Sequence, residues 1–72
     1  MTLAQGQVGM TYKILDIDTD DEELEHFLFT LGCYKDEVVS IVSELSASYV
    51  LAIKDGRYNV DKELAQVIIV EE

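Results

Sequence analysis

Proline and tryptophan are absent from this 72-residue sequence, and cysteine and histidine occur once each, as Cys33 and His26. A single cysteine excludes an internal disulfide and is typical of a reducing compartment, so we expect a cytoplasmic protein. One histidine and one cysteine are also too few for a structural zinc site, which needs about four protein ligands. We therefore expect no metal site and no cofactor.

Basic residues are scarce. Five Lys and Arg stand against 15 Asp and Glu, which gives a formal net charge of -10. Because the basic residues are scattered singly, they cannot form a stripe that follows phosphate groups, and this excludes nucleic acid and anionic membrane surfaces as partners. Such a charge favours instead a partner with a basic surface.

Long apolar runs are missing as well. The longest are YVLAI and VIIV, far short of the roughly 20 residues of a membrane span, so direct membrane insertion is excluded. The first ten residues lack a basic segment, and no signal peptide is predicted. With 49% apolar residues the chain is expected to fold, as a single domain over residues 1–72.

Most of the chain has strand character. The dipeptide Asp55-Gly56 between apolar stretches predicts a tight hairpin with a type I′ turn, which needs positive φ at both central residues. Ser46-Ala47 predicts a second tight turn. Segments rich in β-branched and aromatic residues then predict five strands: Thr11–Asp18, Glu37–Leu45, Ser48–Ile53, Arg57–Val60 and Val67–Val70.

One segment departs from the strand pattern. Leu24, Phe27, Leu28 and Leu31 recur at the spacing of one helix face, and they are expected to pack on the core. Gly32 is the expected end of this helix, because glycine enters the left-handed conformation without steric cost.

Two capping boxes mark the start of the same helix. Thr19 with Glu22, and Asp20 with Glu23, each have the spacing in which the cap and the third helical residue bond reciprocally. A further short helical turn is expected over residues 61–66, with Asp61 as its N-cap. The fold class is therefore mainly β: a small closed or half-closed barrel with one inserted helix and a short helical turn before the last strand.

Asp16, Asp18 and Asp20 alternate in the acidic stretch DIDTDDEELE, as the first ligands of a calcium-binding loop do. Such a loop also needs glycine at its sixth position and a bidentate glutamate at its twelfth. Counted from Asp16, these positions hold Asp21 and Phe27, so a calcium loop is excluded. The acids fit the end of a strand and the start of a helix.

No catalytic constellation is visible, and we expect no enzyme. His26 is the one ordinary general base, and its place among acids predicts an exposed side chain. Gly6-Gln7-Val8-Gly9 does not have the spacing of a phosphate-binding loop.

Phe29 is the residue that the helix pattern leaves unexplained. It lies off the predicted core face, beside Glu22, Glu25 and His26. Three interpretations stay open: the barrel or an N-terminal segment wraps over it, a partner protein contacts it, or it is an ordinary exposed apolar residue. Glu22, Glu25, His26 and Phe29 are the candidate partner-binding residues.

Several short motifs follow one another in a recognisable order. They are Leu3-x-x-Gly6-Gln7-x-Gly9, then FLFTLG over residues 27–32, then EVVSI over residues 37–41, DGRYNV over residues 55–60 and the closing ELAQVIIV. Over nearly its whole length the chain resembles FeoA, a small cytosolic protein of the bacterial ferrous iron uptake system. The family often has proline at the position of Gln5 and a Pro-Gly turn at Tyr34-Lys35-Asp36.

The resemblance implies an SH3-like barrel that acts without catalysis, by contact with the cytosolic region of the FeoB-type permease. Two alternatives share the fold. One is the C-terminal regulatory domain of a metal-dependent transcriptional repressor. The other is an SH3 module for proline-rich peptides, which would need its tyrosines, Tyr12, Tyr34, Tyr49 and Tyr58, to converge in one groove. Because side chains alternate along strands, we do not expect them to converge.

Overall fold

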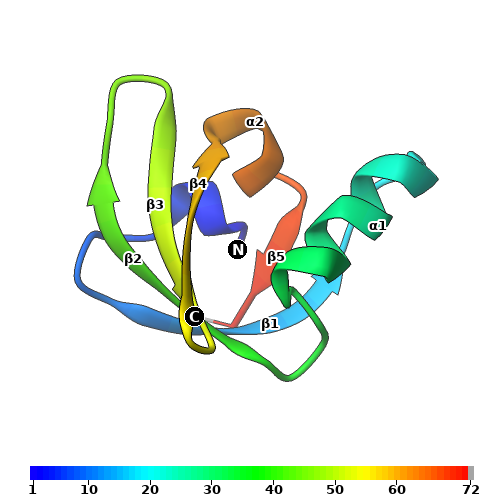
Figure 1. The fold of residues 1–72 in the computed structure, drawn as a ribbon, viewed down its shortest axis with the longest axis horizontal. Helices are drawn as coiled ribbons and strands as arrows, with labels where there is room; N and C mark the ends of the chain where they lie inside the picture. The colour runs from blue at the N-terminus through cyan, green and yellow to red at the C-terminus, as the bar shows by residue number, and fades with distance from the viewer. Residues whose placement is uncertain (72) are drawn as a thin grey trace.

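A single antiparallel sheet of five strands forms the body of the computed structural model, which describes residues 1–71 (Figure 1). The strand order is β4-β3-β2-β1-β5. Every predicted strand is present, with its ends within one residue of the expected positions. The strands are β1 (Thr11–Ile17), β2 (Val38–Glu44), β3 (Ser48–Ile53), β4 (Gly56–Asp61) and β5 (Ile68–Val70).

The first strand belongs to both halves of the curled sheet. Residues 11–13 of β1 pair with β2, whereas residues 14–17 pair with β5. The register shifts between Ile14 and Asp16 in β1 and between Ile41 and Ser43 in β2. Such irregularities increase local twist, and they bend the two strands around the core. The mainly β, SH3-like class is confirmed, although β4 and β5 do not pair and the barrel stays open between them.

Alternation along the strands directs apolar side chains inward. In β3 the burial is nearly continuous, whereas β2 and β4 alternate between buried and exposed residues. No helix of residues 1–71 is both long enough and apolar enough to cross a membrane. The fully buried core side chains include Leu3, Ile14, Leu28, Ile41, Leu51, Ile53 and Ile68.

The N-terminal segment closes one end of the core, an arrangement that the sequence did not predict. A 3-10 helix, η1 (Leu3–Gln5), buries Leu3 completely. Thr2 bridges to Ile69, and the N–H of Val70 donates to the carbonyl of Met1 at 2.8 Å. The outer edge of β5 is therefore covered by the start of the chain.

The hairpin between β3 and β4 is confirmed, but its turn lies one residue earlier than predicted. Ile53 pairs with Gly56, so Lys54 and Asp55 are the central residues. Only Lys54 has a positive φ, 54°. The expected type I′ turn is therefore wrong, because positive φ at the first central residue alone is the pattern of type II′. The tight turn at Ser46-Ala47 is confirmed by the hydrogen bond from Leu45 N–H to Ser48 carbonyl, 2.8 Å.

The inserted helix α1 (Glu22–Leu31) projects from the end of β1, to the side of the sheet in Figure 1. It ends at Gly32, whose φ of 102° confirms the predicted left-handed stop. The N–H of Gly32 donates to Phe29 and the N–H of Cys33 to Leu28, each at 3.0 Å. This is the paired bonding of a Schellman motif, and it buries Cys33 against the helix end.

A four-residue helix, α2 (Lys62–Ala65), lies between β4 and β5, where the sheet is open (Figure 1). Asp61 occupies the N-cap position as predicted, but its side chain makes no capping hydrogen bond. Ala65 is fully buried, so the helix contributes a small side chain to the core.

Candidate functional site

The acidic stretch forms the end of β1 and the start of α1. Asp21 is the N-cap: its Oδ1 accepts hydrogen bonds from the N–H groups of Glu23 at 3.0 Å and Leu24 at 3.2 Å. The two predicted capping boxes are therefore wrong, since the helix begins two residues later than the Thr19 box implies and one residue later than the Asp20 box implies. Thr19 instead accepts from the N–H of Asp21 at 3.1 Å, which fixes the turn before the cap.

The solvent side of α1 is acidic. We call Glu22, Glu23, Glu25, His26 and Phe27 the outer face of α1. All are exposed except Glu25, which is half-buried. Glu22, Glu23 and Glu25 lie in the first turn, where negative charge favours the positive end of the helix dipole, and the last turn holds no basic residue.

The aromatic residue exposed on this face is Phe27, with 45% of its surface accessible. The prediction that Phe27 packs on the core is wrong, and the core position at the centre of the helix belongs to Leu28. Phe27 and Phe29 each lie about 100° around the helix from Leu28, one on either side. Which of Phe27 and Phe29 is exposed therefore depends on the residues that pack beside the helix.

Phe29 is half-buried and packs against the core cluster. Its ring stacks on that of Tyr34, with the centroids 5.6 Å apart, and Tyr34 comes from the loop after α1. The ammonium of Lys54 lies 5.0 Å from the centroid of Tyr34 and 3.8 Å from a carboxylate oxygen of Glu37. Phe29 therefore packs on the core of the barrel, as one interpretation expected, and Tyr34 from the loop after α1, which was not predicted, covers it further.

Cys33 and His26 lie in different environments. Cys33 is fully buried, and burial raises the pKa of its thiol to about 11, whereas His26 is exposed. A thiol with that pKa stays protonated near neutral pH and is a poor nucleophile and a poor metal ligand. Within residues 1–71, no three His, Cys, Asp or Glu side chains gather as a metal site would require.

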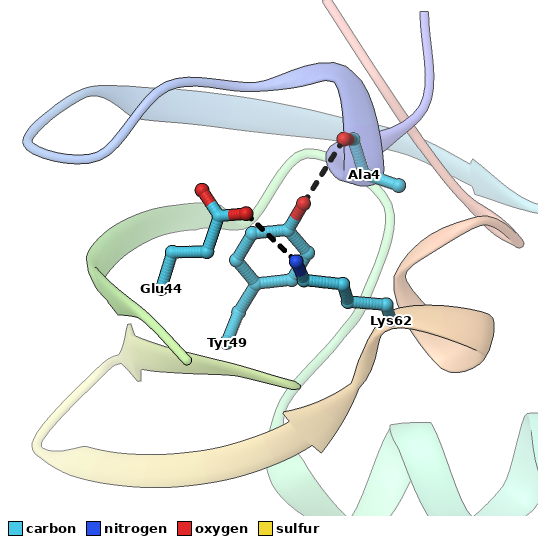
Figure 2. A network of polar contacts seen from close by, with 4 residues as sticks. All are labelled: Ala4, Glu44, Tyr49 and Lys62. Atoms are coloured by element: carbon cyan, nitrogen blue, oxygen red, sulfur yellow. Dashed lines mark hydrogen bonds and ion pairs between the residues drawn. The ribbon is translucent and has the colours of Figure 1, made fainter. Parts of the chain in front are cut away.

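A second polar group lies where α2 meets η1, β2 and β3, and the sequence did not predict it. We call Ala4, Glu44, Tyr49 and Lys62 the α2 corner (Figure 2). The Nζ of Lys62 donates to Glu44 Oε2 at 2.7 Å and lies 5.3 Å from the centroid of the Tyr49 ring. Tyr49, only 5% exposed, donates its hydroxyl to the carbonyl of Ala4 at 3.1 Å.

The α2 corner joins η1, β2, β3 and α2, which are distant in the sequence. The hydrogen bond that Lys62 donates to Glu44 raises the pKa of Lys62 above its ordinary value. No local spacing indicates this group, because its members are brought together only by the sheet. An open hollow of about 420 Å³ beside it is lined by Ala47, Asp61, Lys62 and Glu63.

The four tyrosines have separate neighbours. Tyr49 is buried in the α2 corner, and Tyr34 stacks on Phe29. The hydroxyl of Tyr12 accepts from the N–H of Gln7 at 2.9 Å. The ring of Tyr58 lies against Gly56 of its own strand. These positions do not form the aromatic groove that proline-rich peptides need.

Solved structures with this fold fall into two groups. One contains FeoA proteins: that of Stenotrophomonas maltophilia in complex with zinc matches with a TM-score of 0.88 at 17% identity, over 99% of this chain and 89% of that one. A crystal structure titled iron uptake regulatory protein (FeoA) matches with a TM-score of 0.87 at 14% identity, over 97% and 93% of the two chains.

The other group contains transcriptional repressors. A manganese-dependent transcriptional repressor matches with a TM-score of 0.87 at 19% identity, over 97% of this chain but only 40% of that one. The likeness therefore concerns one part of the repressor. At these identities the structural matches establish the fold, an SH3-like barrel with an inserted helix.

The match to a family model assigns the chain to a protein family. No curated protein sequence matches the chain. The model described as the FeoA domain, however, matches residues 1–72, the full length of the sequence. The chain belongs to the FeoA domain family.

Proposed function

We propose that this chain is an accessory protein of bacterial ferrous iron uptake and acts by contact with the cytosolic region of a FeoB-type permease. The observation that carries the proposal is the FeoA family match over residues 1–72. The S. maltophilia relative is described as possibly acting as a bacterial ferrous iron transport activating factor. A role in binding without catalysis also fits the buried, protonated Cys33.

The outer face of α1 is the surface that we propose for this contact. It combines acidic side chains with His26 and an aromatic ring, and a net charge of -10 favours a basic partner. Glu22, Glu25 and His26 remain the proposed polar contacts. Phe27 is the better aromatic anchor than Phe29, because it is 45% exposed and Phe29 is half-buried under Tyr34.

The test is chemical-shift mapping of the ¹⁵N-labelled chain against the isolated cytosolic domain of the permease. We expect the largest shifts over residues 22–27, and a dissociation constant that rises about tenfold with Phe27→Ala. Glu22→Gln should weaken binding, whereas Glu63→Gln, which also neutralises an acid in the first turn of a helix, should not. Shifts confined to the opposite side of the barrel, or none at all, would contradict the proposed surface.

A regulatory domain of a metal-dependent repressor is the second candidate, and the repressor matches support it. The described residues, however, contain α1 and α2 separated by three strands, which is not a helix-turn-helix. Failure of the chain to bind any cytosolic part of the permease, together with binding of a repressor's DNA-binding domain, would favour this second candidate.

A further inference from the structure

The outer edge of β4 is an open strand edge. β4 is the terminal strand of the sheet, and β5, the other terminal strand, is covered by Met1 and Thr2. Within residues 1–71, no backbone hydrogen bond outside the β3–β4 ladder involves residues 56–60. An uncovered edge presents unpaired N–H and C=O groups that can receive another strand.

The register of the hairpin determines which groups point outward. Ile53 and Gly56 close a two-residue turn, so they form a hydrogen-bonded pair. Bonded and non-bonded pairs alternate along an antiparallel ladder, and the bond from Lys62 N–H to Ala47 carbonyl, 3.1 Å, continues the same alternation. Arg57, Asn59 and Asp61 are then the residues whose N–H groups point away from β3.

These three residues make the edge complementary to itself. Their side chains project to one side of the sheet, and all three are exposed. If a second β4 lies antiparallel across this edge with Asn59 opposite Asn59, Arg57 of each copy lies opposite Asp61 of the other. Opposite charges that face each other across strands are favourable, whereas like charges in that position repel.

We propose that a second copy of this chain pairs with it through β4, in an antiparallel, two-fold symmetric contact centred on Asn59. The contact is isologous, as in most homodimers, and it continues the sheet from one copy into the other. Asn59 N–H donates to Asn59 carbonyl in each direction, and Asp61 N–H donates to Arg57 carbonyl. The surface is separate from the outer face of α1, so this proposal does not depend on the proposed permease contact.

The contact is expected to be weak. It involves one short strand from each copy, and two chains with a charge of -10 each repel one another. We expect a dissociation constant on the order of 0.1 mM at about 0.5 M salt, where repulsion is largely screened. Sedimentation equilibrium over protein concentrations on either side of this value measures it.

Amide hydrogen exchange locates the contact. The N–H groups of Asn59 and Asp61 should exchange quickly in dilute solution and become protected in concentrated solution. Those of Tyr58 and Val60, which bond to β3, should stay protected in both. A dimer that leaves Asn59 and Asp61 unprotected overturns the proposal, as does a chain that stays monomeric up to about 1 mM, tenfold above the expected constant.

Charge exchange provides the matched control. Arg57→Glu should raise the dissociation constant by about tenfold, because a like charge then faces Asp61. The double variant Arg57→Glu with Asp61→Arg should restore the dimer, since the opposite charges are exchanged. Lys13→Glu changes the net charge equally, on an exposed residue of β1, which β2 and β3 separate from β4 in the sheet, and should leave the dimer unchanged.

Asn59→Pro tests the backbone. Proline removes an N–H that points outward, so β3–β4 pairing is kept while the central bonds of the dimer are lost. A folded Asn59→Pro variant that still dimerises overturns the proposal. Should this variant unfold, the charge-exchange series decides, because Arg57→Glu alters only an exposed side chain.

Discussion

The α2 corner and the outer face of α1 are formed by different elements, and they differ in whether their polar side chains have partners within the fold. In the α2 corner, Lys62 contacts both Glu44 and the ring of Tyr49, and Tyr49 bonds to a backbone carbonyl (Figure 2). On α1, by contrast, three glutamates lie in the first turn of a helix that contains no Lys or Arg. The side chains of the α2 corner connect elements of the fold, whereas the outer face of α1 exposes charged side chains to solvent.

This difference separates residues that stabilise the fold from residues that are available to a partner. Substitutions in the α2 corner or at the junction of α1 with the barrel should change the free energy of unfolding, because they remove partnered or buried groups. Substitutions on the outer face of α1 should leave it nearly unchanged, because exposed residues contribute little. Four changes test the contrast, from the largest expected effect to the smallest.

Gly32→Ala should lower the free energy of unfolding by about 2 kcal/mol, measured by urea unfolding. Its φ is 102°, and an added Cβ would lie 3.0 Å from Cγ2 of Ile53. Gly9→Ala is the matched control: its φ is 89°, but nothing lies within 4 Å of the added Cβ, so about 1 kcal/mol is expected. Equal losses at both positions would show that the contact with Ile53 contributes nothing.

Phe29→Ala should lower the free energy of unfolding by about 2 kcal/mol, because a half-buried ring stacked on Tyr34 is lost. Phe27→Ala should change it by no more than about 0.5 kcal/mol, since Phe27 is exposed. Thermal unfolding followed by circular dichroism measures both. A larger loss from Phe27→Ala than from Phe29→Ala would reverse our assignment of the two sides of α1.

Tyr49→Phe should cost about 1 kcal/mol in urea unfolding, because it removes the hydroxyl that bonds to Ala4 and keeps the ring. Tyr12→Phe is the comparison, since it also removes one hydroxyl but at a less buried position that accepts from Gln7. We expect a smaller loss there. An equal loss would indicate that burial does not strengthen the bond in the α2 corner.

The smallest effect is the pH dependence of the Lys62–Glu44 pair. Because the folded pKa of Lys62 lies above its ordinary value of 10.5, the pair stabilises the fold fully below pH 10.5. This stabilisation is lost as the pH rises through the folded pKa. NMR titration of the Lys62 side chain should show the raised pKa, and Glu44→Gln should return it toward 10.5. An unchanged titration in Glu44→Gln would show that Glu44 is not its cause.

Local patterns predicted the regular elements well and the helix surface less well. All five strands, the presence of both tight turns and the stop at Gly32 were predicted from β-branched runs, turn-forming dipeptides and glycine chemistry, which act over a few residues. The pattern placed Phe27 on the core face and Phe29 off it, and the structure reverses the two, because both flank Leu28 by the same angle. Tyr34 decided it by packing against Phe29 from the following loop.

The exact residues of the helix start and of the β3–β4 turn were also not predictable from local sequence preferences. Thr19, Asp20 and Asp21 are all residue types that cap helices well, so the local sequence does not distinguish them. In the structure, β1 ends at Ile17 and Asp21 is the N-cap. In the turn, the pairing of Ile53 with Gly56 placed Lys54 in the left-handed region, although Gly56 adopts such a conformation at lower cost. Sheet register here outweighed local preference.

The sequence by itself determined the number of strands, the inserted helix, the acidic charge and the resemblance to FeoA, because these depend on composition and on order along the chain. Only the tertiary structure decided that Met1 and Thr2 cover the edge of β5, that Lys62 contacts Glu44 and Tyr49, and that Phe27 is the exposed aromatic residue of the outer face of α1. Each of these is a contact between residues distant in sequence or a choice made by such a contact. These contacts form because the sheet curls, and the spacing of residues along the chain does not predict that curl.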